Sequence, residues 1–297
     1  MAKILIAQDV EKSYGNIKAL RGASLEVSTR EIVGLVGPNG TGKTTLIKIS
    51  LGLLRRDSGT VLLNGRDPFL DYRAREGVSV VFERPMLPNS IRIADLLERA
   101  ARIYGSSRAS VREAIKLAGL EGHELKTFEE LSAGLKQRAA IAHALVAEPN
   151  FIIADEPTSN LDPLERRRIL ELIAELNKDK GISFLISSHI IAEVVNVANR
   201  IVALAKGKTV ASGSPSEILK KASLARVRAP DPEALASALA DQGFLVEQEG
   251  FSVIIRLNDY SEYPQLLEAL ASIARSGLTI LSVDLAGVSI EEMIKAG

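Results

Sequence analysis

GPNGTGKTT (residues 37–45) is the stretch of this chain that decides its fold class. It matches the pattern G-x-x-x-x-G-K-[ST], which describes a loop that binds phosphate groups. An apolar run, EIVGLVG (31–37), precedes the loop, and a helical stretch, TLIKISLGLL (45–54), follows it. This context favours a phosphate loop over the alternative, a glycine-rich turn with a solvent-exposed lysine.

The residue types in this loop suit a nucleotide. Its glycines let the main chain curl, so that N–H groups from about Gly40 to Thr45 can face the phosphates. Lys43 is expected to neutralise the β- and γ-phosphates, and the hydroxyl of Thr44 is expected to ligate Mg²⁺. The residues expected to bind the nucleotide here are Gly37, Pro38, Asn39, Gly40, Thr41, Gly42, Lys43, Thr44 and Thr45.

Three more apolar runs are continuous rather than alternating, as expected for strands of a parallel sheet that helices cover on both faces. They are VSVVF (78–82), FIIAD (151–155) and ISFLIS (182–187), and helical stretches lie near 44–54, 91–103, 110–118, 133–147 and 163–178. This order predicts an α/β fold over residues 1–222, a P-loop NTPase core with a largely parallel sheet. The mainly helical part, about 84–148, is expected to form a subdomain beside the sheet.

The pattern changes after Gly213. Short apolar and helical stretches then alternate as β-α-β-β-α-β, the order of a ferredoxin-like unit. Asp231 followed by Pro232 is a favourable helix start, with a cap residue before a proline in the first helical position. We therefore predict a small α+β accessory domain at 223–297. The alternative is a segment that packs irregularly against the main domain.

The bulk composition excludes several classes of protein. Lys+Arg and Asp+Glu both total 37, and residues 226–297 hold 5 basic and 11 acidic residues, so no nucleic-acid partner is expected. The absence of cysteine excludes disulfides and cysteine-ligated metals. The N-terminal residues lack a signal-peptide core, and no run approaches the roughly 20 apolar residues that span a bilayer. Any work at a membrane is therefore expected to need a partner.

Two further motifs point to phosphate chemistry. FIIADEP (151–157) is an apolar run that ends in two adjacent acids, at the end of a strand where such folds bind ligands. Asp155 is expected to hold Mg²⁺, and Glu156 to orient or deprotonate an attacking water, although alone they could be solvated acids. His189 follows another buried strand; it is either an ordinary boundary residue or a hydrogen-bond donor to a phosphate oxygen or to the water.

Together these motifs resemble the nucleotide-binding subunit of an ATP-binding cassette (ABC) transporter, over about residues 3–220. GPNGTGKTT resembles the Walker A motif, FIIADE resembles Walker B, and His189 the switch histidine. SNLD (159–162), which ends in Asp162, resembles the D-loop, and Tyr14 matches the aromatic residue that stacks on adenine. LSAGLKQR, which read alone is a capped helix start with an optional anion site, takes the place of the family signature.

The resemblance implies a transport-coupled ATPase with ATP and Mg²⁺ as cofactors. In the family, two cassettes pair head to tail, and each signature caps the γ-phosphate that the other chain binds. By this resemblance the Ser132 hydroxyl and the Gly134 amide would reach a nucleotide on a second chain, in a homodimer or a heterodimer. It also implies a separate integral membrane subunit that docks around residues 83–105, and a cytoplasmic chain peripheral on the inner face of the cell membrane.

Two positions depart from the family pattern. The signature is commonly LSGGQ, whereas this chain carries Ala133 and Leu135. Glu83 stands in VVFERP, where the family's Q-loop carries glutamine. We expect Glu83 to ligate Mg²⁺ or to hold water in a catalytic role, the alternative being a solvated loop acid. These departures bear on the rate of hydrolysis and its coupling, not on nucleotide binding.

The last residues, VSIEEMIKAG (288–297), resemble the end of the small C-terminal domain that many export cassettes carry. This favours an exporter. Two alternatives remain open at this point: a soluble ABC-type ATPase acting without a membrane partner, and an ATP-dependent clamp that binds ATP but hardly hydrolyses it.

Overall fold

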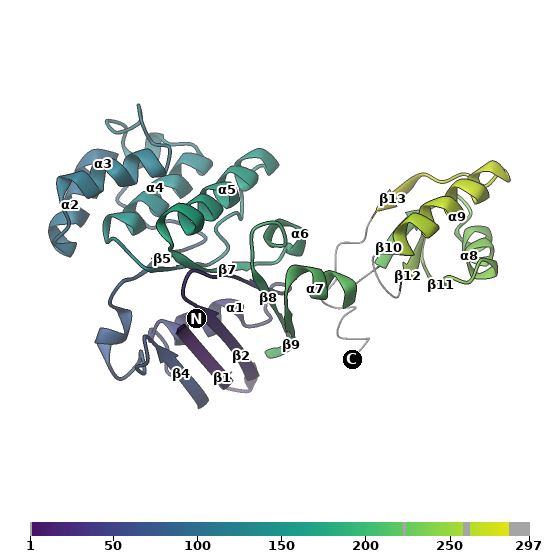
Figure 1. Ribbon diagram of the computed structural model, residues 1–297, viewed down its shortest axis with the longest axis horizontal. Helices are drawn as coiled ribbons and strands as arrows, with labels where there is room; N and C mark the ends of the chain where they lie inside the picture. The colour runs from purple at the N-terminus through teal and green to yellow at the C-terminus, as the bar shows by residue number, and fades with distance from the viewer. Residues whose placement is uncertain (1, 222–223, 258–261, 285–297) are drawn as a thin grey trace. The chain divides into compact units, whose positions relative to one another are not determined.

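The computed structural model describes residues 2–221, 224–257 and 262–284. The chain divides into two compact units, Met1–Ser212 and Gly213–Gly297 (Figure 1). The sequence predicts the boundary at residues 222–223, which lie outside the described residues, so that boundary stays a prediction. VSIEEMIKAG (288–297) also lies outside them.

A six-stranded sheet forms the centre of the first unit. Its strand order is β5 (Val78–Val81), β6 (Phe151–Ala154), β7 (Ser183–Ser188), β3 (Ile32–Val36), β8 (Arg200–Ala205) and β9 (Lys208–Gly213). The strand pairs from β5 to β8 are parallel. Every residue of β3, β6 and β7 is buried, which explains why these strands are continuous apolar runs in the sequence. The largely parallel sheet is thus confirmed.

One face of this sheet packs on α1 (Lys43–Ser50). Beyond α1 lies an antiparallel sheet with the order β2 (Ile17–Ser28), β1 (Lys3–Tyr14) and β4 (Ser58–Leu63). Leu5 and Leu25 of the antiparallel sheet, Ile47 of α1 and Leu185 of the parallel sheet belong to one hydrophobic core. The strands β1, β2 and β4 were not predicted from the sequence.

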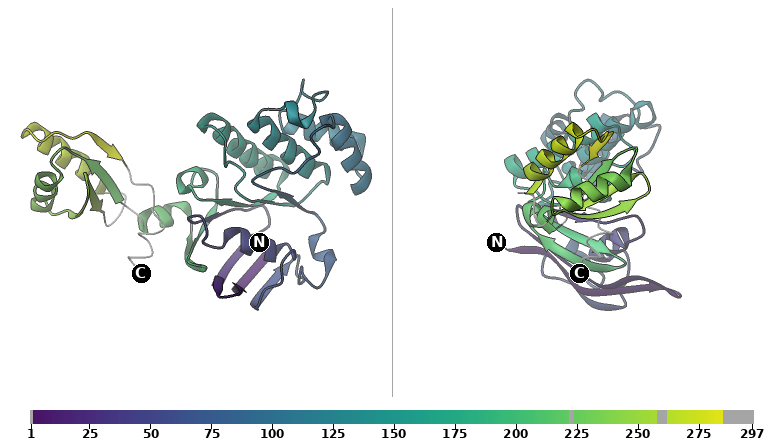
Figure 2. Two further views of the ribbon diagram at one scale, coloured as in Figure 1. Left: turned by 180° about the vertical axis from the view of Figure 1, so that it is seen from behind. Right: turned by 90° about the vertical axis from the view of Figure 1, so that its right-hand side faces the viewer.

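Helices cover the other face (Figure 2). They are α2 (Ile93–Tyr104), α3 (Arg108–Leu117), α4 (Ala133–Val146) and α5 (Pro163–Lys180), with the short elements η2 (Phe128–Glu130) and α6 (Ile191–Val194). The elements from α2 to α4 fall within about 84–148, and their assignment to a separate subdomain stays a prediction. The short element η1 (Tyr72–Arg75) instead contacts β4, and its Ala74 belongs to the core shared with the antiparallel sheet. The oxygens of Ser107, Ser132 and Asp162 accept main-chain hydrogen bonds at the starts of α3, α4 and α5, which is the capping that such residues provide. The predicted helices therefore form close to their predicted ranges.

The second unit has the predicted ferredoxin-like order. After α7 (Pro215–Lys221) come β10 (Leu224–Arg228), α8 (Pro232–Asp241), β11 (Leu245–Glu249), β12 (Ser252–Arg256), α9 (Tyr263–Arg275) and β13 (Ser282–Asp284). The strands form an antiparallel sheet in the order β11-β12-β10-β13. Asp231 caps α8 by accepting from Ala234 N at 3.0 Å. The unit has its own core, with Val227, Leu235 and Leu266, so the alternative of irregular packing is wrong.

No helix within the described ranges is both long and apolar enough to cross a membrane.

Candidate functional site

Three segments meet at the carboxyl edge of the parallel sheet. They follow β3, β6 and β7, which are neighbours in the sheet, and the parallel register pairs Val36 with Ser188 and Ala154 with Ile186. Gly37 N donates to Ser188 O at 3.2 Å, which ties the phosphate loop to the segment after β7. Parallel strands place their carboxyl ends together, and this is where open α/β sheets bind ligands.

The loop between β3 and α1 has the backbone that a phosphate site needs. Gly42 has φ 103° at the start of α1, and a Cβ there would lie 2.7 Å from Ala19 O, so only glycine fits without a shift of β2. The first N–H groups of α1, those of Lys43, Thr44 and Thr45, donate to no acceptor within the described residues. Free N–H groups at a helix start favour an anion.

The other residues of the loop are placed around this helix start. Thr41 Oγ1 donates to Pro38 O at 2.9 Å, which closes the turn. Gly37 lies against β8, since a Cβ there would come within 2.3 Å of Leu204 O. Asn39, Gly40 and Thr44 are exposed to solvent.

Lys43 connects the loop to the acidic segment. Its Nζ donates to Gly37 O at 2.7 Å and to Pro38 O at 3.2 Å. The same ammonium lies 3.1 Å from Glu156 Oε1, as an ion pair outside hydrogen-bond geometry. Both side chains are at most 10% exposed. The structure thus brings together two residues that the sequence assigns to separate motifs.

The acids that follow β6 are buried and differ in their partners. Asp155 N donates to Val81 O at 2.8 Å, and Asp155 Oδ1 accepts from Ser187 Oγ at 2.7 Å. Ser187 Oγ in turn accepts from Glu156 N at 2.8 Å. Ser187 is therefore a bridge that orients both acids. No sequence motif predicted Ser187, although the two serines in a buried apolar strand are a signal for it.

Glu156 lies at the centre of the cluster. It has φ 50°, an uncommon backbone conformation for a residue with a side chain, and its Oε2 lies 2.8 Å from His189 Nδ1. Burial raises the pKa of Glu156, but the His189 hydrogen bond and the Lys43 charge outweigh it, so that the pKa is lowered overall from the ordinary 4.5. Glu156 is therefore held as a carboxylate. This is the form that can accept a hydrogen bond or a proton from a water molecule.

Three further residues that the sequence predicts are Glu83, Asp162 and Tyr14. Glu83 is exposed, and its Oε1 accepts from Asn160 Nδ2 at 3.4 Å. Asp162 Oδ1 accepts from two N–H groups in the first turn of α5, both at 3.0 Å. Tyr14 is 48% exposed at the end of β1, with Lys12 Nζ 5.9 Å from its ring centroid. An exposed ring with a cation beside it has a free face for stacking.

The signature segment lies away from the phosphate loop. α4 packs with α3 and α5, whereas α1 packs with β1, β2 and β4 on the other face of the sheet. Ser132 is exposed, and its Oγ accepts from Leu135 N at 3.3 Å. Gly134 is buried: a Cβ there would lie 2.4 Å from Glu165 Oε2. Within the described residues, no hydrogen bond or ion pair joins Ser132 or Gly134 to residues 37–45.

The family model described as ABC transporter matches residues 20–159. An uncharacterised ABC transporter ATP-binding protein of Nostoc sp. is 34% identical, in an alignment that covers 97% of this chain and 88% of that protein. This chain belongs to the ABC transporter ATP-binding family. It is therefore an ABC-type ATPase that binds nucleotide.

Two further proteins resemble this ABC cassette. The Nod factor export ATP-binding protein I of Burkholderia orbicola is 34% identical, over 78% of the cassette and 79% of that protein. The dimeric post-hydrolysis state of the ATP-binding cassette MJ0796, with ADP and Pi bound, superposes with a TM-score of 0.62 and 27% identity, over 71% of this cassette and 98% of that chain.

Proposed function

We propose that this cassette is the ATP-hydrolysing subunit of a membrane exporter and works with a separate integral membrane subunit on the inner face of the cell membrane. The contact of Lys43, Glu156 and His189 beside the phosphate loop carries the hydrolytic part of the proposal. The exporter part is supported by the similarity to a Nod factor export protein and by the small second unit.

The loop binds the phosphates of ATP through its main chain. The free N–H groups of Lys43, Thr44 and Thr45 point the positive end of α1 at the β- and γ-phosphates. Lys43 Nζ, now held by two loop carbonyls and by Glu156, exchanges some of these contacts for phosphate oxygens. Pro38, Asn39, Gly40 and Thr41 shape the loop, and Tyr14 stacks on the adenine.

The donors around the loop suit Mg²⁺, which prefers oxygen ligands and completes its shell with phosphate and water. Thr44 offers an exposed hydroxyl at the start of α1. Asp155 uses only Oδ1 in its bond to Ser187, and no described residue bonds to Oδ2. Glu83 can add a further carboxylate. The bound ion would supply charge neutralisation at the phosphates.

Glu156 and His189 act on the attacking water. When a phosphate oxygen pairs with the Lys43 ammonium, Glu156 loses this cation, which is one of the causes that lower its pKa. His189 Nδ1 holds Oε2, which leaves Oε1 to accept the water proton. With Nδ1 donating to Glu156, Nε2 of the neutral imidazole accepts a hydrogen bond from the water, and only the protonated imidazole donates to a γ-phosphate oxygen.

Ser132 and Gly134 complete the site of a second cassette. The Ser132 oxygen accepts a hydrogen bond within its own chain, so its O–H remains a donor to phosphate. The lack of contact between these residues and their own phosphate loop supports a role in trans, as does the similarity to a dimeric cassette with ADP and Pi bound. Asp162, at the start of α5, lies in the same interface.

Co-isolation tests the membrane partner. Tagged full-length cassette should co-purify from detergent-solubilised membranes with an integral membrane protein, identified by mass spectrometry, and its ATPase activity should require Mg²⁺. Met86, in the predicted docking region, is 93% exposed, so Met86→Glu should break the complex. Phe251→Glu, at a 79% exposed side chain in the second unit, is the matched control. If the cassette hydrolyses ATP and no membrane protein co-purifies with it, the soluble ATPase is favoured instead. If it binds ATP but hardly hydrolyses it, the ATP-dependent clamp is favoured.

A further inference from the structure

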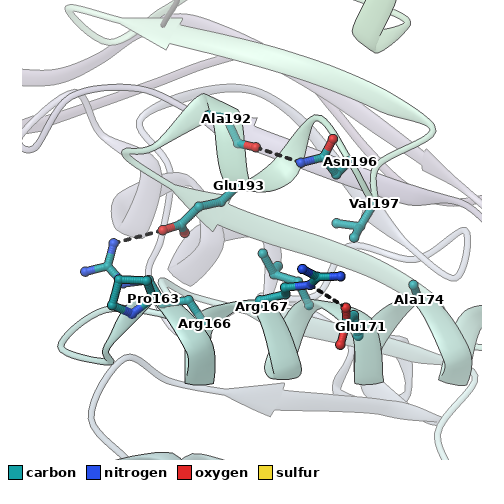
Figure 3. Close-up of a pocket in the computed structure, with 10 residues that line it drawn as sticks. Pro163, Arg166, Arg167, Glu171, Ala174, Ala192, Glu193, Asn196 and Val197 are labelled. Atoms are coloured by element: carbon teal, nitrogen blue, oxygen red, sulfur yellow. Dashed lines mark hydrogen bonds and ion pairs between the residues drawn. The ribbon is translucent and has the colours of Figure 1, made fainter.

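Glu193 connects the segment after β7 to the segment after β6. It lies on α6, four residues beyond His189. Its Oε2 accepts from Thr158 Oγ1 at 2.9 Å, and its Oε1 accepts from Arg166 Nη1 at 2.9 Å. Figure 3 shows Glu193 reaching from α6 toward the start of α5. Both carboxylate oxygens are thus held by residues that follow Glu156 in the chain.

Arg166 extends this connection to residues 159–162. Its Nε donates to Leu161 O at 2.7 Å while its Nη1 holds Glu193. The Glu193 side chain is 14% exposed and that of Arg166 30%, so water screens this pair less than an ion pair on the open surface. The first turn of α5, the segment with Leu161, and α6 are therefore fixed to one another by polar contacts.

A cavity of about 640 Å³ lies between part of α6 and α5. Its lining is mixed: Leu170, Ala174, Ala192 and Val197 are apolar, and Arg166, Glu171 and Asn196 are charged or polar. On its other side α6 does pack closely: Val194 is fully buried, and a Cβ on Gly34 of β3 would lie 2.3 Å from Val194 Cγ1. Toward α5 and the segment before it, Glu193 adds the polar contacts with Arg166 and Thr158.

We propose that Glu193 is a positioning residue for ATP hydrolysis. By holding α6 to Thr158 and Arg166, it keeps the imidazole of His189 in contact with Glu156. This inference rests on the proposed role of His189. The opposing possibility is that Glu193 only stabilises the fold, and the experiment below separates the two.

Glu193→Gln tests the proposal because it keeps the shape and removes the charge. An amide cannot accept from both Thr158 and Arg166 through its two terminal atoms, since its NH₂ only donates. We expect kcat for ATP hydrolysis to fall about tenfold, the scale of one hydrogen bond to a charged group, with KM for ATP unchanged. The matched control is Glu171→Gln: Glu171 pairs with Arg167 at 2.7 Å beside the same cavity and is 51% exposed. Its kcat should stay within about twofold of the parent.

The imidazole signals of His189 give a readout that a merely structural role would not move. The chain has 3 histidines, so His189→Gln assigns the pair of ¹⁵N resonances. In the parent, donation from Nδ1 to Glu156 should keep the two shifts well separated, because it fixes one tautomer. In Glu193→Gln they should converge, whether or not the melting temperature falls, while the Glu171→Gln spectrum stays at the parent's values.

Unchanged kcat and unchanged His189 resonances in Glu193→Gln would overturn the proposal. So would a lower melting temperature with parental resonances, because that is a structural effect only. Arg166→Lys is a second variant: it keeps a cation for Glu193 but cannot also reach Leu161 O, and it should give an intermediate kcat. The NMR readout needs no hydrolysis. If His189→Gln hydrolyses ATP like the parent, the proposed role of His189 in hydrolysis is wrong. Converging His189 resonances in Glu193→Gln would still show that Glu193 positions the imidazole ring.

Discussion

Replacing Lys43 by methionine tests whether the buried ion pair with Glu156 stabilises the protein without nucleotide. The two charged groups lie 3.1 Å apart and are at most 10% exposed. Removing one partner leaves Glu156 as a buried carboxylate whose Oε1 has no cation, and it leaves Gly37 O and Pro38 O without their Nζ donor. Breaking a buried pair in this way costs about 3 kcal/mol or more in free energy of unfolding.

The pH dependence separates this electrostatic loss from a packing effect. The folded-state pKa of Glu156 is below its ordinary value of 4.5. Its contribution to stability is therefore present above 4.5 and is lost as the pH falls through the lowered folded-state value. In Lys43→Met the charge of Lys43 no longer lowers this pKa. The difference between parent and variant should be full at pH 7 and should shrink as Glu156 becomes protonated in both.

The assay is urea unfolding followed by far-ultraviolet circular dichroism at a series of pH values, since the chain has no tryptophan. Lys43→Met/Glu156→Gln should recover most of the loss, because no buried charge remains unpaired. Lys3→Met is the control: its 2.7 Å pair with Glu26 is exposed and should contribute less than about 1 kcal/mol. A loss that stays constant with pH, and that Glu156→Gln does not relieve, would refute the reasoning.

Three further outcomes are expected. Glu156→Gln should trap an ATP-bound dimer, and light scattering that finds only monomer with ATP and Mg²⁺ would contradict the head-to-tail pairing. His189→Ala should lower kcat about a hundredfold with little change in nucleotide affinity, measured by calorimetry; weaker binding in proportion would argue against a role in hydrolysis. Gly42→Ala should weaken nucleotide binding because its Cβ meets Ala19 O. Gly40→Ala, where φ is also positive but nothing lies within 4 Å, should bind more tightly than Gly42→Ala, and equal affinities would count against the steric argument.

The parallel sheet was readable from the sequence because its strands are buried on both faces. Such strands are short, continuous and apolar, as in FIIAD and ISFLIS, and they contrast with the helices between them. The antiparallel sheet was missed for the opposite reason. β1 and β2 are each 12 residues long, their burial alternates irregularly, and their pairing shifts register at several positions. An irregular pairing of this kind breaks the period of two on which strand prediction depends.

The motifs of the site were readable, but their contacts were not. Spacing identified Lys43 and Glu156 as separate phosphate and water residues, and nothing in either motif indicates that their side chains meet. That contact depends on the strand order β6-β7-β3, which places the two strand ends near each other. The same holds for Ser187 and Glu193, because each acts on a segment about 30 residues away in the chain.

Gly134 of the signature segment lies close to another helix of its own chain as well as in the predicted interface with a second chain. Gly134 was predicted to present its amide to a second chain, yet its α-carbon also lies against Glu165. A methyl group at 134 would displace the end of the Glu165 side chain, whose carboxylate accepts from Arg168 Nη1 at 2.5 Å and lies 3.9 Å from Arg138 Nε. Within a single chain, a side chain at 134 would therefore rearrange these ion pairs between α4 and α5.

The neighbouring departure from the family pattern has no such cost. Ala133 is exposed in the first turn of α4, where alanine favours a helix more than glycine does. The methyl group at 133 is exposed within its own chain, so its consequences fall mainly on whatever approaches the start of α4 from outside. If a second cassette docks there, the two adjacent positions differ: a side chain at 134 would meet Glu165 of its own chain as well as the second cassette, whereas the methyl group at 133 would meet mainly the second cassette. Ala133→Gly should accordingly change dimer formation with ATP more than it changes the stability of the monomer.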